Sequence, residues 1–525
     1  MGVSYRRGNV ERHLTLPLAY AGRVGQLLLS VAAFLVGWQV IVLATGLPPV
    51  ILPSPADVAT AVLANAGSMW THVRYTMWEV LLGWLVGISV GGLFALCMAA
   101  SRRLRLLVYP YLIAVRILPL VVLAPILILL IGPNLLMRVL LASILTFFPV
   151  TIATLDGLLS VSDDQIALLQ SVGAPTWKRL VFVQVPNAIP GIFAGLKIAT
   201  PLAVEGVILA EFLASSRGIG YRLLQTASSL QTPLLFGYMF VLMGVGIVIF
   251  GAVLLADRIA RWDDGDDVVS EHLWDGGAVT GSRDRLSQGL IVASLVGLLI
   301  VWNLGAAAMP HARLFLPTPR EVGAILLSEP RLFVRSTAQT LVKFGSGWLL
   351  GAGVGFGLGA VAALVPRIRT VVYTYLVGVR VMPVIAFAPI LLVWLGVSFE
   401  AATVLVGAST FFPIAMGAAT GLERLPAAHD ELFRLVDAPA WRIFLVRLRY
   451  ATPALFSGIK LSVITGLSGV IIAEWFVADG GLGVLVLQQT RTFQPDLSFA
   501  AILWLFVVGA GAFGLASTLQ RRLAW

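Results

Sequence analysis

The sequence predicts an all-α integral membrane protein, with about twelve transmembrane helices in two parallel six-helix repeats. The first observation is composition: of 525 residues, 58% are hydrophobic and only 12% are charged, and the mean hydropathy is +0.93. These values lie outside the range of soluble globular domains. The second observation is a series of apolar runs of about twenty residues. The third is that the two halves of the chain resemble each other in sequence.

Each long apolar run is expected to be a helix, because backbone amides in hydrocarbon must be bonded within their own segment. In the first half the expected spans are residues 27–47, 80–100, 108–131, 139–158, 189–212 and 234–256. In the second half they are residues 290–309, 341–365, 371–395, 401–422, 454–476 and 499–519. The first run is too long for the core of a cleaved signal peptide, so a retained span is expected there.

The placement of charge predicts the orientation and the boundary between the halves. Basic residues fall mainly at the ends of alternate connections, which the positive-inside rule assigns to the cytoplasm, together with both termini. They are dispersed rather than gathered with aromatic residues, so the net charge of +10 does not indicate nucleic-acid binding. A polar segment with an acidic cluster, residues 263–287, is the expected cytoplasmic linker between a first unit (1–262) and a second unit (288–525).

An internal repeat relates the two units at a constant offset of 264 residues. Leu52-Pro53-Ser54-Pro55 falls on Leu316-Pro317-Thr318-Pro319, and Thr146-Phe147-Phe148-Pro149 falls on Thr410-Phe411-Phe412-Pro413. After a gap of one residue, Lys197 pairs with Lys460 and Glu211 pairs with Glu474. Each unit has an even number of expected spans, so the repeats enter the membrane in the same direction, around an axis along the membrane normal.

The longest cytoplasmic connection of each unit, residues 159–188 and 423–453, has a recurring pattern. Each contains a turn, a proline suited to the first position of a helix, a tryptophan and basic residues. This pattern predicts a short helix lying parallel to the membrane in each loop, at residues 175–181 and 439–445. The candidate coupling residues are Gly173, Ala174, Pro175, Trp177 and Lys178 in the first loop and Glu431, Asp437, Pro439, Trp441 and Arg442 in the second.

With these loops the chain resembles the permease subunits of binding-protein-dependent ABC importers, whose loop motif is E-A-A, three residues, G, nine residues, I-x-L-P. Gly173 occupies the glycine position and Pro186 the final proline, while Ala167-Leu168-Leu169 replaces E-A-A. In the second loop Glu431 keeps the leading glutamate and Asp437 replaces the glycine. The segments 52–58 and 316–322 look like those of the nitrate, sulfonate and taurine branch.

The resemblance implies the partners and the cellular location. The chain is expected in the bacterial inner membrane, with ABC ATPase subunits, as two copies or a pair, docked on the two loops and an extracytoplasmic solute-binding protein outside. The unequal loops favour either two different ATPase subunits or one site that couples more strongly. The branch points to small anions such as sulfonates, taurine or nitrate, although relatives also carry pyrimidine precursors of thiamine.

Several motifs of catalytic proteins do not occur in the sequence. It contains no G-x-x-x-x-G-K-S/T phosphate-binding loop, so ATP hydrolysis is expected in a partner subunit rather than in this chain. Its five histidines and one cysteine form no cluster with metal-ligand spacing, so neither a metal nor a cofactor is expected. The alternative function is a secondary transporter with two parallel six-helix halves, which would not need the two patterned loops.

Charged residues inside the predicted spans are the candidates for a translocation path, since charge at membrane depth is costly. Lys197 and Lys460 lie near the cytoplasmic ends, where structural pairing is the alternative role. Glu211 and Glu474 lie near the external ends and are expected to be gate or structural groups. Glu205 lies in mid-span and has no acidic counterpart in the second unit. It either lines the path, favouring a cationic or hydrogen-bonding solute, or pairs with a neighbouring lysine.

Overall fold

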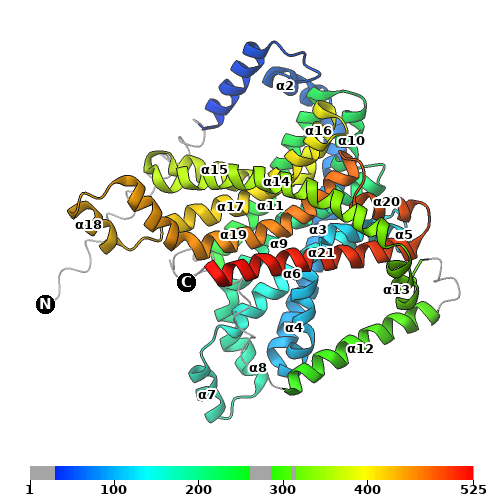
Figure 1. The fold of residues 1–525 in the computed structure, drawn as a ribbon, viewed down its shortest axis with the longest axis vertical. Helices are drawn as coiled ribbons and strands as arrows, with labels where there is room; N and C mark the ends of the chain where they lie inside the picture. Colours follow the sequence, from blue (N-terminus) through cyan, green and yellow to red (C-terminus); the bar gives the residue numbers. More distant parts are fainter. Residues whose placement is uncertain (1–29, 261–284, 309–314, 524–525) are drawn as a thin grey trace.

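The structure is a computed structural model that describes residues 30–260, 285–308 and 315–523, and within these ranges every regular element is helical (Figure 1). The predicted linker, except for its last residues, lies outside the described part. After a first helix at Ser30–Thr45, the helices of the first unit are α2 (Pro55–Ala64), α3 (Ala66–Ala100), α4 (Arg102–Ile117), η1 (Leu120–Val122), α5 (Leu123–Ile131), α6 (Leu135–Leu159), α7 (Asp163–Ser171), α8 (Thr176–Arg179), η2 (Leu180–Gln184), α9 (Val185–Ala214), α10 (Ile219–Ser228) and α11 (Thr232–Ala260).

The second unit repeats this order of elements. Its helices are α12 (Arg285–Ala308), α13 (Pro319–Ser328), α14 (Pro330–Leu364), α15 (Pro366–Val381), η5 (Val384–Phe387), α16 (Ala388–Leu395), α17 (Phe399–Leu422), α18 (Ala427–Leu435), α19 (Ala440–Phe476), α20 (Leu482–Arg491) and α21 (Pro495–Leu523).

Eight helices of the described residues are long and apolar enough to cross a membrane, or up to nine if a bent pair counts as one span. The protein is therefore a multi-pass helical membrane protein, and the predicted number of twelve spans is not confirmed. The first helix of each unit is apolar but shorter than a full span in the described part, at Ser30–Thr45 and Ala293–Ala308.

The third expected span of each unit, residues 108–131 and 371–395, was predicted as one continuous helix, and this is wrong. In the first unit the two segments on either side of the break are bent by 87°. The break falls before Pro119 in the first unit and before Pro383 in the second, where Leu118 (ψ 129°) and Met382 (ψ 122°) are not helical. A proline pushes the preceding residue out of the helical region, and its own nitrogen cannot donate a helical hydrogen bond.

Each unit has a core of three long helices, α3, α6 and α9 in the first and α14, α17 and α19 in the second. Glycines at every fourth position of α3 and α14 allow neighbouring helices to approach closely. A Cβ on Gly87 would lie 2.8 Å from the carbonyl oxygen of Ser143, and one on Gly355 would overlap the carbonyl oxygen of Phe411. Helix packing therefore depends on backbone contact along these faces.

Backbone details recur between the units and support a duplication. Both α2 and α13 begin with a capping box, from Ser54 to Asp57 and from Thr318 to Glu321. Residues with positive φ also recur at matched positions: Gly132 and Gly396, Gly218 and Gly481, and Leu230 and Phe493.

The two units contact each other reciprocally. The bend η1 contacts α19 of the second unit, and η5 contacts α9 of the first; α5 contacts α20, and α16 contacts α10. The hydroxyl oxygens of Tyr111 and Ser294 lie 2.6 Å apart. The counterpart of Tyr111, Tyr375, donates its hydroxyl to the carbonyl oxygen of Ser30 at 2.9 Å. Contacts that occur twice with the partners exchanged are the signature of a two-fold relation.

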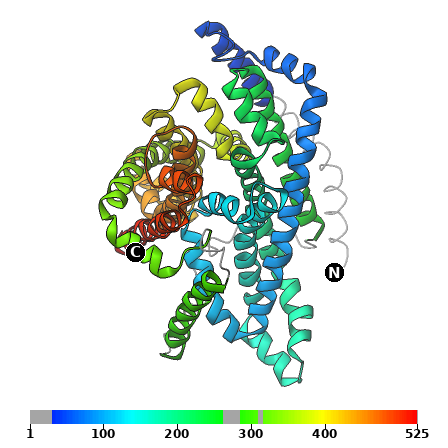
Figure 2. The ribbon, with the colours of Figure 1, turned by 90° about the vertical axis from the view of Figure 1, so that its right-hand side faces the viewer.

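The long helices of the two units cross. In Figure 1 those of the first unit run up the page and those of the second run across it, and Figure 2 shows the second unit end-on beside the first. The helices α7 and α18 lie at the lower and left margins, and α2 and α13 at the upper and right margins. A two-fold axis running from lower left to upper right exchanges the units and leaves both loop helices on one side.

Candidate functional site

The loop helices do not lie where the sequence predicted them. Residues 175–181 and 439–445 are not short separate helices but the beginnings of two long ones, which run over Thr176–Ala214 and Ala440–Phe476. Pro175 and Pro439 each take the N-cap position, and each helix continues past the prolines further along it, Pro190 and Pro201 in the first and Pro453 in the second. The short helices precede these prolines, as α7 (Asp163–Ser171) and α18 (Ala427–Leu435).

A tight turn joins each short helix to the long one. Gly173 has a φ of 72° and Asp437 a φ of 47°, so both occupy the left-handed region. Glycine adopts this region freely, and aspartate is among the few other residues that visit it. The replacement of glycine by Asp437 therefore preserves the turn, which shows why the two loops can share a shape without sharing a motif.

Apolar side chains are exposed at matched positions of the two loops. Trp177 is 58% and Trp441 is 60% exposed, and Lys178 and Arg442 lie over their rings at 5.6 Å and 5.3 Å. Three further matched pairs of exposed apolar residues are Leu168 with Leu432, Val172 with Val436, and Val181 with Leu445. Clustered exposed apolar residues next to basic groups make these loops candidates for a surface that a partner covers.

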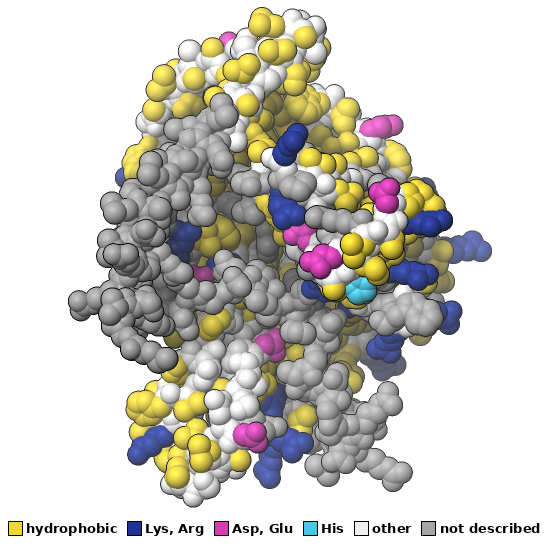
Figure 3. Space-filling model, turned by 90° about the vertical axis from the view of Figure 1, so that its left-hand side faces the viewer, with side chains coloured by type: hydrophobic (Ala, Val, Ile, Leu, Met, Phe, Trp, Pro, Cys, Tyr) yellow, Lys and Arg dark blue, Asp and Glu magenta, His cyan; other side chains and the backbone are white. Residues whose placement is uncertain are grey.

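The other predicted loop residues share this exposure, except for half-buried Ala174. Figure 3 faces the side that carries α18, where dark blue basic side chains lie among yellow apolar ones, with a second such group at the lower tip of the molecule.

Near the opposite ends of the long helices, Glu211 and Glu474 are buried structural anchors. Glu211 accepts hydrogen bonds from Thr76 Oγ1 (2.7 Å) and from the backbone nitrogen of Gly220 (2.6 Å). Glu474 accepts them from Thr340 Oγ1 (2.8 Å) and from the nitrogen of Gly483 (2.7 Å). Each carboxylate thus holds the start of a short helix, α10 or α20, where the helix dipole favours negative charge.

Two threonines in these anchors were missed by the sequence reasoning. Thr76 and Thr340 each accept a hydrogen bond from the first backbone nitrogen of the short helix, at Ile219 (2.8 Å) and Leu482 (2.9 Å). Their signal was present, since they lie at the same offset of 264 residues as the rest of the repeat. A buried threonine in an apolar run has no charge to attract notice, and its partner lies more than a hundred residues away.

The two lysines are held inside their own units. Lys197 forms an ion pair with Asp257 of α11, with 2.7 Å between Nζ and Oδ2, and Lys460 is buried. The pairing of Lys197 with Asp257 shows that this lysine is not the counter-ion of Glu205. The role of Asp257 was also missed, because it falls just beyond the predicted sixth span.

Each long helix carries a stripe of exposed or half-buried residues along one of its sides. In α9 the residues at positions 190, 194, 198, 201 and 205 are exposed or half-buried, and in α19 the equivalent positions 453, 457, 461, 464 and 468 are too. Spacings of three and four residues place each set on one side of its helix. The two helices therefore present equivalent stripes, which end at Glu205 and Ser468.

The stripes end beneath an aromatic contact between the units. Phe212 and Phe476 meet edge to face, with 5.2 Å between their ring centroids. Phe212 lies seven residues beyond Glu205, or about two helical turns, so both project from the same face of α9. The stripe of α9 thus points toward the second unit, and the aromatic pair lies beyond the end of the stripe.

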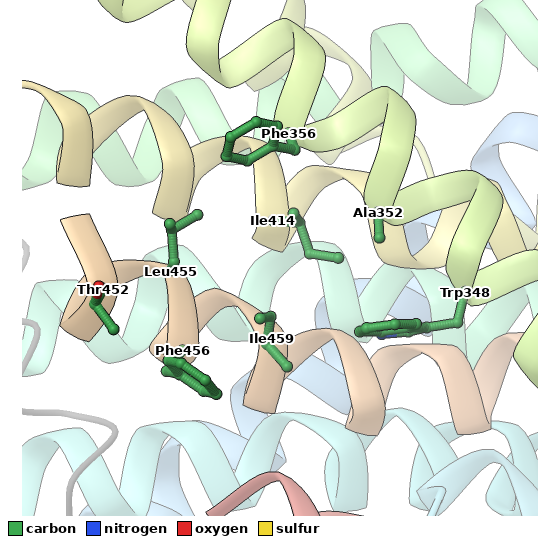
Figure 4. A pocket seen from close by; sticks show the side chains of 8 residues that line it. All are labelled: Trp348, Ala352, Phe356, Ile414, Thr452, Leu455, Phe456 and Ile459. Atoms are coloured by element: carbon green, nitrogen blue, oxygen red, sulfur yellow. The ribbon is translucent and has the colours of Figure 1, made fainter. Parts of the chain in front are cut away.

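A separate pocket of about 270 Å³ lies on the other side of α19, between α14, α17 and α19 (Figure 4). Its lining is almost wholly apolar, with Trp348, Phe356, Phe456 and Ile459 around it. The indole nitrogen of Trp348 is already bonded to Ser462, at 2.8 Å. Ile459 lies nine residues before Ser468, which is two and a half turns and therefore the opposite face. This pocket is not part of the stripes.

Two helical units that meet around a central contact, each with a loop and a long helix leading to that contact, are the architecture of a membrane permease. The chain belongs to the family of binding-protein-dependent transport system inner membrane components, which matches it twice, at residues 85–263 and 355–525. It is a permease subunit of an ABC transporter for small solutes, built as a tandem fusion, and ATP hydrolysis resides in a separate subunit.

Similar proteins each align with less than half of this chain. The formylaminopyrimidine transport permease protein of Halalkalibacterium halodurans is 34% identical over 214 residues, which are 40% of this chain and 85% of that protein. The riboflavin transport system permease protein of Chloroflexus aurantiacus is 31% identical, covering 44% and 87%. The taurine transport system permease protein of Escherichia coli is 27% identical, covering 43% and 82%. No solved structure matches the chain.

Proposed function

We propose that the two units of this chain form the complete translocation path of an importer, between the accessible stripes of α9 and α19. Residues 1–262 and 288–525 act as the two permease units, joined by a linker at 263–287. Both termini and both loops lie in the cytoplasm, because the loop helices share one side of the two-fold axis and carry basic residues. The pair of Phe212 and Phe476 then closes the path on the external side.

The observation that carries this proposal is the continuity of each long helix from an exposed loop to the central contact. The helix Thr176–Ala214 has 39 residues and Ala440–Phe476 has 37. At 1.5 Å per residue, each spans roughly 55 Å. A displacement imposed on Trp177 or Trp441 therefore reaches the external closure through one helix, as a rigid-body motion.

The coupling sites then comprise the loop helices together with the turns and the first turn of the long helices. Gly173, Ala174, Pro175, Trp177 and Lys178 form one site, and Glu431, Asp437, Pro439, Trp441 and Arg442 form the other. Each is proposed to receive one ABC ATPase subunit. The first long helix contains a π-helical turn, at Leu180–Gln184, where the second is regular. This difference supports unequal coupling at the two sites, because a π-helical turn changes the register of the helix through which the displacement passes.

An extracytoplasmic binding protein is proposed to dock on the opposite side, over α2 and α13. Their capping boxes fix two short helices on that surface, one from each unit, in equivalent places. The solute is proposed to be a small organic molecule. The relatives' names include taurine and aliphatic sulfonates as well as formylaminopyrimidine and riboflavin, so both anions and nitrogen heterocycles are candidate classes.

The coupling sites can be tested by adding charge to the exposed apolar residues of each loop. Leu168→Glu and Leu432→Glu change matched residues that are 66% and 51% exposed. The chain, co-expressed with its ATPase subunits, is purified from membranes and the amount of ATPase retained per permease is measured. Each single variant is expected to retain about half of the ATPase, and the double variant almost none, because burying an unpaired charge opposes docking.

The chain offers matched controls for this experiment. Leu63 and Leu327 are leucines at equivalent positions of α2 and α13, 75% and 84% exposed, on the opposite side of the molecule. Leu63→Glu and Leu327→Glu are expected to leave ATPase retention unchanged. Full retention by the loop double variant would place the docking surface elsewhere and overturn the proposal.

A further inference from the structure

The end of the stripe on α9 carries a carboxylate that the structure leaves without a protein partner. Glu205 is half-buried and, among the described residues, forms no hydrogen bond or ion pair with another side chain. Lys197, on the same helix, is paired with Asp257. Glu211, six residues further, is fully occupied by Thr76 and Gly220. A carboxylate at membrane depth is costly unless it meets water or a ligand, so a free one indicates a function.

The opposite stripe ends in a different group. Ser468 occupies the position equivalent to Glu205, is also half-buried, and has its hydroxyl bonded to the carbonyl of Ile464 at 3.4 Å. Where the two stripes end, at what we call the apex, α9 therefore carries an acidic group and α19 a neutral hydroxyl. The two-fold relation of the units does not extend to this point, and charge is found only on the first unit.

We infer that Glu205 and Ser468 form an asymmetric solute-recognition site at the apex of the path, selective for a cationic group or for the N–H donors of a nitrogen heterocycle. Glu205 accepts the charged or polar N–H groups, and the hydroxyl of Ser468 adds a neutral contact from the other side. A sulfonate or nitrate is repelled there, because it brings a second negative charge close to the carboxylate. This inference rests on the proposed path between the stripes.

The test measures the electrostatic field at the apex with charged thiol reagents. Ser468→Cys is made in a Cys97→Ser background, which removes the single native cysteine. The full chain in nanodiscs is treated with methanethiosulfonate reagents that carry either a trimethylammonium or a sulfonate group. The ratio of the two modification rates is compared with that of Ser457→Cys, three helical turns lower on the same stripe. Ionisation of the thiol affects both reagents alike, so the ratio reports on the field.

The cationic reagent is expected to be favoured about five-fold more at position 468 than at position 457. Adding Glu205→Gln should remove this preference while leaving the thiol accessible. Millimolar guanidinium should slow the modification at position 468, with no such effect in the Glu205→Gln variant, whereas methanesulfonate should have no effect in either.

The outcomes separate this inference from the function on which it rests. If neither reagent modifies the thiol at position 468, the stripe does not face an open path, and the proposed path itself fails. If both reagents react there with a ratio that Glu205→Gln does not change, the path stands and the recognition site is wrong. Protection by methanesulfonate rather than guanidinium would reverse the solute class.

Discussion

The anchors at Glu211 in the first unit and Glu474 in the second have the same carboxylate but opposite charges around it. In the second unit, Lys343 lies 3.3 Å from Glu474 and also donates to the carbonyls of Asp479 (2.7 Å) and Gly480 (2.5 Å). In the first unit the equivalent residue is Glu79, which pairs with Arg138 at 2.8 Å. The second unit has Ala402 where the first has Arg138. The cation thus comes from α6 in the first unit, as Arg138, and from α14 in the second, as Lys343.

Both anchors therefore keep the same hydrogen bonds around the glutamate, whereas the charged residue that accompanies it differs. The threonine, the glutamate and the glycine turn are the same in both anchors, and their bonds agree within 0.1 Å. The frame fixes the short helices α10 and α20, which contact the broken third helix of the other unit. The surrounding charges only have to keep the buried carboxylate satisfied.

The largest expected effect is the loss of the buried cation in the second unit. Lys343→Met removes the ion pair of Glu474 while keeping the length of the side chain, and it should lower the free energy of unfolding by about 3–5 kcal/mol. The measurement is denaturant unfolding in detergent, followed by tryptophan fluorescence. Arg331→Met, on an exposed part of the same helix, should change it by less than about 0.5 kcal/mol. If both variants lowered the free energy of unfolding equally, the ion pair of Lys343 with Glu474 would not be a specific source of stability.

The next effect tests the part that the two anchors share. Gly218 (φ 99°) and Gly481 (φ 111°) lie against the carboxylates of Glu211 and Glu474, and an added Cβ would overlap them. Gly218→Ala and Gly481→Ala should each destabilise by about 2–3 kcal/mol, from backbone strain and displacement of the carboxylate. Gly251→Ala in α11 and Gly511→Ala in α21, where a Cβ meets open space, are the helical controls. A large difference between the two anchor variants would show that the frames are not equivalent.

A third experiment gives the first unit the charged residues that the second unit has at the equivalent positions. Glu79→Lys gives the first unit the lysine of the second, but the new lysine lies beside Arg138 and the two cations repel each other. Arg138→Ala alone leaves Glu79 buried without its cation. Each single change should cost about 2 kcal/mol, and the double variant should recover at least 1 kcal/mol, as a coupling energy. The cycle is measured by the same unfolding assay. Strictly additive costs would mean that the two anchors are not interchangeable.

The sequence predicted the architecture well where the signal was local or repeated. The duplication follows from residues that recur at one offset. The broken third helices were missed because their apolar runs are continuous, and nothing in the sequence distinguishes Pro119 and Pro383, at the breaks, from Pro110, Pro125 and Pro389 in the same runs. The loop helices were misplaced because Pro175 and Pro439 can begin either a short or a long helix.

The rest of the site depends on contacts that no local pattern contains. Asp257 and Arg138 are ordinary charged residues in sequence, and their partners Lys197 and Glu79 lie about sixty residues away. The bond from Thr76 to Glu211 joins residues 135 positions apart. Such pairs follow from how α3, α6, α9 and α11 pack together, and packing geometry is not encoded in the spacing of any one segment.

The capping boxes of α2 and α13 are nearly alike in the two units, and changes there should have the weakest effect on stability. Ser54 Oγ donates to Asp57 Oδ2 at 2.7 Å and accepts from the backbone nitrogen of Asp57 at 3.1 Å. The bonds that the carboxylate accepts from Ser54 Oγ and from the backbone nitrogen of Ser54 (2.9 Å) hold the pKa of Asp57 below its usual value of 3.8. Ser54→Ala and Thr318→Ala should each cost about 1 kcal/mol at pH 7, because each removes a helix cap.

The pH dependence of the stability lost in Ser54→Ala distinguishes the contribution of the Asp57 carboxylate from that of the Ser54 hydroxyl. A lowered pKa means that the charged form of Asp57 stabilises the folded protein above the unfolded pKa, and that this contribution is lost as the pH falls through the folded one. The penalty of Ser54→Ala should therefore shrink between pH 7 and pH 3, measured as the difference in unfolding midpoint from the parent at each pH. A penalty that stays constant would assign the whole cap to the serine hydroxyl and its bond to the backbone, with no part for the charge of Asp57.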